Sequence, residues 1–275
     1  MGEGETGCGR TFRMISRCAY NQHMAGEDSV EALCERGQEE LMGMEYLAAE
    51  RTLARAERMA WGERQWDLLS RLYMPLQEAR RQRRQRCGEG VVCLDLLSEG
   101  PDDHVEARHV VEHYPHGQLL VAGWGTIEPA VKVREMAAEL GLYVETFLGA
   151  VYAGSGGKRI VVIAPMGDVA MPVAGAVGSV EELKGKLPGG CLVMGEDELP
   201  RGSRKGTYQT YGEVMGMWER LHLPFLAAAD GEKDEVARME GYRKTIRVDY
   251  ACELAHQKLS DVAREMGRKA SAWSL

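Results

Sequence analysis

Residues 91–97 read VVCLDLL, a short apolar run that ends in Ser-Glu-Gly-Pro. A run of this length before turn residues predicts a buried strand. Similar apolar runs follow at 118–122, 143–152, 159–164 and 191–194. Helical patterns separate most of them, at about 103–114, 128–140 and 180–187. Strands that alternate with helices predict an α/β fold with a mainly parallel sheet, flanked by helices from both ends of the chain. The sequence GSGG at 154–157 predicts a turn between one antiparallel strand pair.

The composition excludes several classes of protein. The chain has 275 residues, of which 44% are hydrophobic and 28% charged, as in ordinary globular domains. No run of about 18 apolar residues exists, so we expect no membrane span. The net charge of -8 argues against nucleic-acid binding. The seven cysteines are widely spaced and form no Cys-x-x-Cys pair, which favours a reducing cytoplasm over a disulfide framework or a structural zinc site.

The composition also suggests an organisation along the chain. Residues 1–27 are Gly-rich and predict a flexible tail, and residues 28–87 predict helical hairpins. The α/β core is expected over 88–200. Residues 201–275 predict a loop and C-terminal helices that pack on the core or on the N-terminal helices. The last of these helices spans about 234–268, with a break near His256.

The predicted N-terminal helices carry a spaced pattern of small and large side chains. The matching positions are Gly37, Tyr46, Ala49, Leu53 and Ala56, followed about 34 residues on by WDLLSRLY at 66–73. In this pattern, segment 30–75 resembles the tetratricopeptide repeat, with Ser70 in place of a glycine. The resemblance implies stacked helical hairpins that contact a protein partner. An ordinary hairpin packed on the α/β core is the alternative, and exposure of Trp66 and Tyr73 would distinguish the two.

Five arginines, at positions 80, 81, 83, 84 and 86, follow this segment. They could contact phosphates, but we interpret the run as the solvated end of a helix, where cations complement the helix dipole.

A second motif is rich in histidine. Residues 109–113 read HVVEH, which resembles the His-x-x-Glu-His motif of inverted zinc peptidases. Histidines one helical turn apart can hold a metal while the glutamate polarises water. His109, Glu112 and His113 are therefore candidate metal ligands. A solvated helix face with histidines near its C-terminal end is the alternative.

A third motif lies where the predicted strand at 118–122 meets the next helix. The candidate ligand-binding residues there are Gly123, Trp124, Gly125, Thr126 and Glu128. With Glu145 about twenty residues on, the segment loosely resembles the Rossmann dinucleotide fingerprint, although Glu128 replaces the third glycine. The resemblance implies a small anionic ligand at the carboxyl end of the sheet. Basic residues of a later loop, Arg201, Arg204 and Lys205, could close over it.

Two functions remain open on this reasoning. The first is a protein-interaction module built on the repeat-like helices. The second is an α/β enzyme or sensor that binds a small anionic metabolite or nucleotide. The sequence leaves any cofactor and any catalytic residues unknown, and it predicts neither a nucleic-acid nor a membrane partner.

Overall fold

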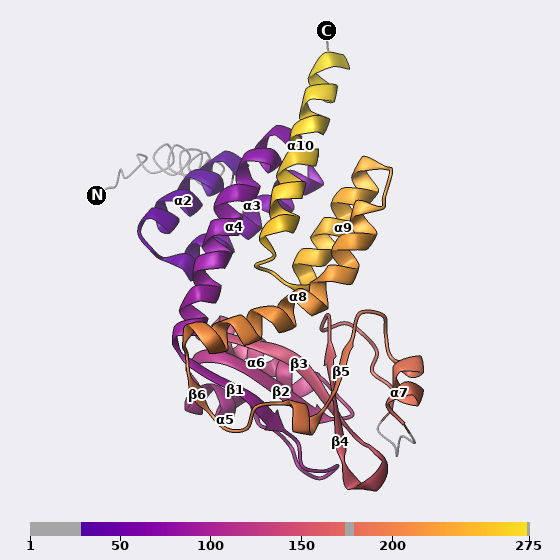
Figure 1. Ribbon diagram of the computed structural model, residues 1–275. Helices are drawn as coiled ribbons and strands as arrows, with labels where there is room; N and C mark the ends of the chain where they lie inside the picture. Colours follow the sequence, from indigo (N-terminus) through magenta and orange to yellow (C-terminus); the bar gives the residue numbers. More distant parts are fainter. Residues whose placement is uncertain (1–28, 174–178, 274–275) are drawn as a thin grey trace, which may run out of the picture.

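The computed structural model describes residues 29–173 and 179–273, and the predicted tail at 1–27 lies outside them. The described chain forms a helical unit above a mixed sheet that has helices on both faces (Figure 1). The sheet confirms the α/β class and the flanking helices. Among the described residues, no helix combines the length and the apolar character needed to cross a membrane.

The sheet of the described residues has six strands, in the order β5-β4-β3-β2-β1-β6. They are β1 (Val91–Leu97), β2 (His116–Trp124), β3 (Tyr143–Ala153), β4 (Arg159–Ala164), β5 (Leu192–Gly195) and β6 (Arg204–Lys205). β1, β2 and β3 pair in parallel, whereas β3–β4, β4–β5 and β1–β6 pair antiparallel. The sheet is therefore mixed, and the prediction of a mainly parallel sheet is wrong. Helical crossovers join β1 to β2 and β2 to β3, but the short turn at 155–157 returns the chain as an antiparallel hairpin, as predicted for that pair.

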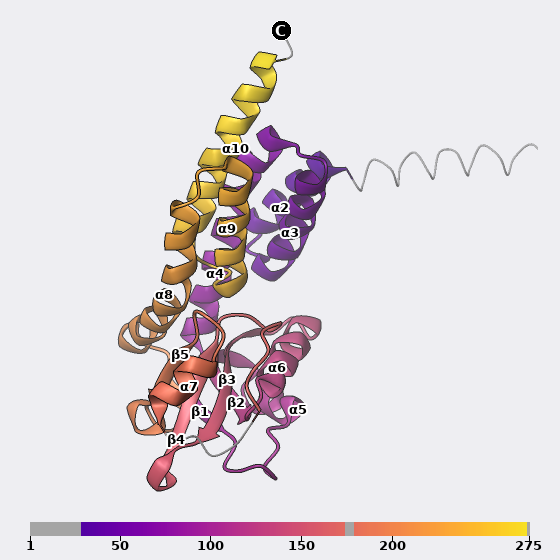
Figure 2. The same ribbon diagram turned by 90° about the vertical axis from the view of Figure 1, so that its right-hand side faces the viewer.

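Helices cover both faces of the sheet (Figure 2). One face packs on α5 (Ala107–His113), α6 (Glu128–Glu139) and α7 (Val180–Lys186). The other face packs on α8 (Tyr208–Asp230), whose buried Trp218 stacks on Phe147 of β3 with ring centroids 4.3 Å apart. Side chains alternate between these faces, since Leu119 and Val121 contact the first set of helices and Leu120 contacts α8.

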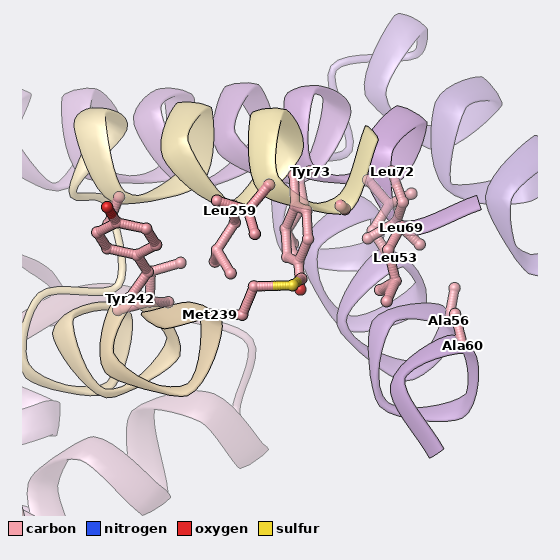
Figure 3. Close-up of a cluster of buried hydrophobic side chains, with 14 of the residues drawn as sticks. Leu53, Ala56, Ala60, Leu69, Leu72, Tyr73, Met239, Tyr242 and Leu259 are labelled. Carbon is pink, nitrogen blue, oxygen red and sulfur yellow. The ribbon is translucent and has the colours of Figure 1, made fainter. Parts of the chain in front are cut away.

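The helical unit consists of elements from both ends of the chain, namely α2 (Val30–Met42), α3 (Tyr46–Gly62), α4 (Trp66–Glu89), α9 (Glu235–Val248) and α10 (Glu253–Trp273). Their apolar side chains form one core with the end of α8 (Figure 3). Ser29 caps α2, since its hydroxyl oxygen accepts a hydrogen bond from the Ala32 N–H at 3.1 Å. Gly37 allows α2 to approach α3, because a Cβ there would lie 2.5 Å from Leu53 Cγ. The sequence left open whether the C-terminal helices pack on the α/β core or on the N-terminal helices. They pack on both, with α8 on the sheet and α9 and α10 on the N-terminal helices.

α4 joins the two units directly. It continues through Pro75 as one helix and is followed after Gly90 by β1. The interpretation of its basic run as a solvated helix end is wrong for three of the five arginines. Arg80 and Arg83 pair with Glu50 of α3 at 3.2 and 2.7 Å, and Arg84 is 2% exposed. These three arginines instead fix α4 against α3 and against the sheet.

Candidate functional site

Arg84 is the centre of a buried ion cluster between the helices and the sheet. Its Nη2 atom lies 2.6 Å from Glu145 Oε1 of β3 and 2.7 Å from Asp249 Oδ1, which follows α9. The guanidinium carbon also lies 4.9 Å from the ring centroids of Trp218 and Tyr250. Gln118 donates a hydrogen bond to the second Glu145 oxygen at 3.1 Å. The carboxylate of Glu145, which forms part of the Rossmann resemblance, is therefore occupied by partners from the same chain.

The predicted ligand-binding turn has a local structural explanation. Gly125 has φ +65°, and its N–H donates to the Val151 carbonyl at 2.8 Å. Gly123 lies against the turn, because a Cβ there would be 2.8 Å from the Thr126 carbonyl oxygen. Thr126 Oγ1 accepts from the Glu128 N–H at 3.1 Å. These bonds occupy amides that a phosphate would need.

Four of the predicted ligand-binding residues nevertheless line one cavity of about 570 Å³, namely Gly123, Trp124, Thr126 and Glu128. Its charged groups are largely paired, since Lys132 binds Glu128 at 2.7 Å and Arg108 binds Glu112 at 3.0 Å.

The basic loop lies elsewhere, at the edge of the sheet. Arg204 and Lys205 form β6, which pairs with the start of β1, and Arg204 binds Glu213 of α8 at 2.7 Å. The Gly202 N–H donates to Asp95 Oδ2 at 2.6 Å. Neither Arg201, Arg204 nor Lys205 lines the cavity at the glycine turn.

The predicted histidine stripe lies on α5 as expected. The His109 and His113 rings stack with centroids 6.1 Å apart, and both line a cavity of about 590 Å³ with His104 and Asp95. Glu112 is exposed and faces Arg108 instead of the imidazoles. The metal assignment for His109, Glu112 and His113 stays a prediction.

A different cavity, of about 510 Å³, lies between α3, α4 and α9 in the helical unit. We name it the arginine cavity. Its basic lining residues are Arg58, Arg80, Arg243 and Arg247, and its acidic ones are Glu57 and Glu240. These groups leave a formal charge of +2 in a chain whose net charge is -8. The positive charge is therefore a local feature and not the background of the chain.

Two of these arginines are held in place. Arg80 Nε donates to Glu50 Oε1 at 3.2 Å, and its Nη1 lies 3.0 Å from His256 Nε2. Arg243 Nε donates to Glu57 Oε1 at 2.8 Å, and its guanidinium carbon lies 4.1 Å from the Trp61 ring centroid. Such contacts fix a guanidinium before a ligand arrives.

The other two arginines are open to solvent. Arg58 of α3 and Arg247 of α9 are exposed, and the structure gives neither of them an ion pair within the described residues. The cavity floor includes Tyr73, which is 1% exposed and donates to Glu57 at 3.3 Å. Burial, followed by the nearby Glu57, raises the pKa of Tyr73 well above its usual value, so its hydroxyl stays a hydrogen-bond donor.

Sequence reasoning missed this cavity because its residues come from positions 54–80 and 240–247, which are distant in the chain. One sequence pattern could have pointed to the cavity, because Arg58, Arg243 and Arg247 each lie beside apolar residues of an amphipathic helix. Such arginines are common on helices, however, and the pattern does not show which helices pack together.

Comparisons of the chain with protein families, with curated proteins and with solved structures find no match.

Proposed function

We propose that the protein is a non-catalytic binding protein whose repeat-like and C-terminal helices hold a small, multiply charged anion. The arginine cavity carries this proposal, because it gathers four guanidinium groups and a net positive charge. Its volume of about 510 Å³ falls in the range typical of small-molecule sites. Guanidinium groups bind phosphate and carboxylate oxygens through paired hydrogen bonds. A phosphorylated metabolite or a nucleotide has the charge and the size that this site suits.

This proposal places the ligand on the helical unit, where α3 and α4, from the segment that resembles the tetratricopeptide repeat, supply part of the lining. Tyr73 is buried and Trp66 is half-buried against the same core, so the two aromatic positions offer little surface to a large protein partner. A small anion needs no such surface.

The cavity at the glycine turn is the second candidate, since four predicted residues line it. Its cations already have carboxylate partners, which favours the arginine cavity for an anion.

The test is isothermal titration calorimetry at low ionic strength with inorganic phosphate, pyrophosphate, citrate and a nucleoside triphosphate. The informative variant is Arg58→Ala with Arg247→Ala, because both side chains are exposed and form no ion pair within residues 29–173 and 179–273, so they should not be needed for folding. We expect it to weaken binding by about tenfold or more, since each charge-assisted hydrogen bond contributes roughly 1.5–3 kcal/mol.

A matched control is Arg36→Ala with Arg51→Ala, which removes the same charge from exposed positions that do not line the cavity. A similar loss in this control would mean that net charge, and not the site, governs affinity. Absence of binding to every anion in the set would overturn the proposal.

A further inference from the structure

A cluster of three potential metal ligands lies apart from the arginine cavity, where α8 meets the turn between α9 and α10. His222 comes from α8, Asp249 directly follows α9, and Cys252 directly precedes α10. One donor atom from each residue lies within 4.8 Å of the other two. Within the part of the chain that the structure describes, no other group of three His, Cys, Asp or Glu residues comes together in this way.

The cluster is largely shielded from water. Asp249 is 1% and Cys252 4% exposed, and the His222 side chain is 13% exposed. His222 Nδ1 lies 2.6 Å from Asp249 Oδ2. An Asp, a His and a Cys in one buried place supply the three donor types, oxygen, nitrogen and sulfur, that zinc takes in proteins.

Contacts with Ala251 and Arg84 already orient the Asp249 carboxylate. Asp249 Oδ1 accepts a hydrogen bond from the Ala251 N–H at 3.1 Å and pairs with Arg84 Nη2 at 2.7 Å. The other oxygen, Oδ2, points to His222. Metal-binding carboxylates in proteins are commonly held in this way, with one oxygen bonded to the protein and the other on the metal.

We propose that His222, Asp249 and Cys252 supply three protein ligands of a Zn²⁺ site. Zinc–ligand bonds of about 2.0–2.3 Å place tetrahedral donors roughly 3.3–3.6 Å apart. The Nδ1–Oδ2 pair would have to open by less than about 1 Å, and donors at the 4.8 Å limit would have to approach by about 1.5 Å at most. Rotations of side chains can supply such shifts. On binding, the thiol and the imidazole lose any proton they carry, because only the deprotonated groups coordinate the metal.

A Cys-His-Asp group can also serve as a nucleophile with its base, but the burial of Cys252 favours a metal. None of the three residues lines the cavities described above, whereas an ion needs no cavity of substrate size. The absence of a Cys-x-x-Cys pair does not conflict with the proposal, because the ligands come from separate elements that the fold brings together.

The test uses the full-length chain, freed of metal by a chelator and then dialysed against Zn²⁺ or Co²⁺ alone. We expect one equivalent of Zn²⁺ per chain, measured by elemental analysis. Co²⁺ should give the near-ultraviolet thiolate-to-metal absorption of a sulfur ligand. Cys252→Ser should abolish that absorption. It should also weaken Zn²⁺ binding by more than the 10- to 100-fold that is typical when a residue hydrogen-bonded to a metal ligand is replaced. His222→Gln should weaken it similarly.

Two controls locate the ion. Cys34→Ser removes a half-buried thiol of α2, and the pair His109→Ala with His113→Ala removes the stacked histidines of α5. Both controls should keep the site. Retention of full affinity in Cys252→Ser, or its loss in the α5 variant, would overturn the proposal. Should a variant fail to fold, the wild-type Co²⁺ spectrum still decides, since the lack of a thiolate band excludes Cys252 as a ligand.

Discussion

Replacement of Arg84 by methionine should be among the most destabilising single changes in this protein. The Arg84 side chain is 2% exposed, and its partners Glu145 and Asp249 are 3% and 1% exposed. Removal of the cation leaves two buried carboxylates without their main partner. Breaking a buried ion pair from one side typically costs about 3–5 kcal/mol. The variant also loses the contacts of the guanidinium with the rings of Trp218 and Tyr250, which further lowers the free energy of unfolding. We therefore expect a destabilisation near the upper end of this range.

The effect should depend on pH in a defined direction. Burial alone would raise the pKa of the Asp249 carboxyl, but Arg84 and a hydrogen bond from His222 hold it well below its usual range. Without Arg84, burial favours the protonated acid. Proton uptake then relieves the unpaired charge, so the destabilisation should be smaller at pH 5 than at pH 8.

The assay is urea unfolding with the metal chelated, followed by circular dichroism, at several pH values. Arg81→Met is a matched control on the same helix, because Arg81 pairs with Glu78 while both side chains are about 40% exposed. Exposed pairs contribute about 0–1 kcal/mol. Equal effects of Arg84→Met and Arg81→Met, or a larger effect at pH 5 than at pH 8, would refute the reasoning.

Two further predictions concern stability. Gly37→Ala should lower the free energy of unfolding by about 1–3 kcal/mol, because its Cβ would overlap Leu53. A Cβ at Gly62 meets no atom within 4 Å, so Gly62→Ala should be neutral or stabilising. Comparison of the urea-unfolding midpoints of the two variants checks this. Burial, followed by repulsion from Arg80, lowers the pKa of His256 to about 3. His256 then stays neutral in the folded chain while it protonates below about pH 6.5 in the unfolded one, so stability should fall by up to about 1.4 kcal/mol per unit as pH drops from 6.5 to 5. His256→Gln should flatten that slope, and an unchanged slope would contradict the assignment.

Local patterns predicted most elements of the fold. The apolar run at 91–97, for example, forms β1 as predicted. The expected break in the last helix exists, but it lies at 249–252 and not at His256, which lies within α10. Asp249 explains the position, because it ends α9 and accepts the Ala251 N–H in the turn. A proline inside a helix commonly bends or breaks it, yet α4 remains one helix through Pro75, with the neighbouring Tyr73 and Leu76 buried in the core.

Long-range partners could not be predicted in the same way. The sequence shows a glutamate within the apolar strand at 143–153, and a buried charge requires a partner. The partner, Arg84, lies 61 residues away, and no periodicity links the two. The same limit applies to the arginine cavity, whose residues meet only when helices from the two ends of the chain pack together. It also applies to His222, Asp249 and Cys252, which meet only when α8 packs against the turn between α9 and α10.

The lengths of the strands also affect how the sheet meets other molecules. The long strands β2 and β3 lie in the interior of the sheet, whereas the outermost strands, β5 and β6, have 4 and 2 residues. The Asp95 carboxylate accepts the Gly202 N–H beside β1, so the loop before β6 extends the cover of that edge. Short edges offer few free N–H and C=O groups to a second chain. This arrangement should keep the protein from joining sheet to sheet with its own copies at high concentration.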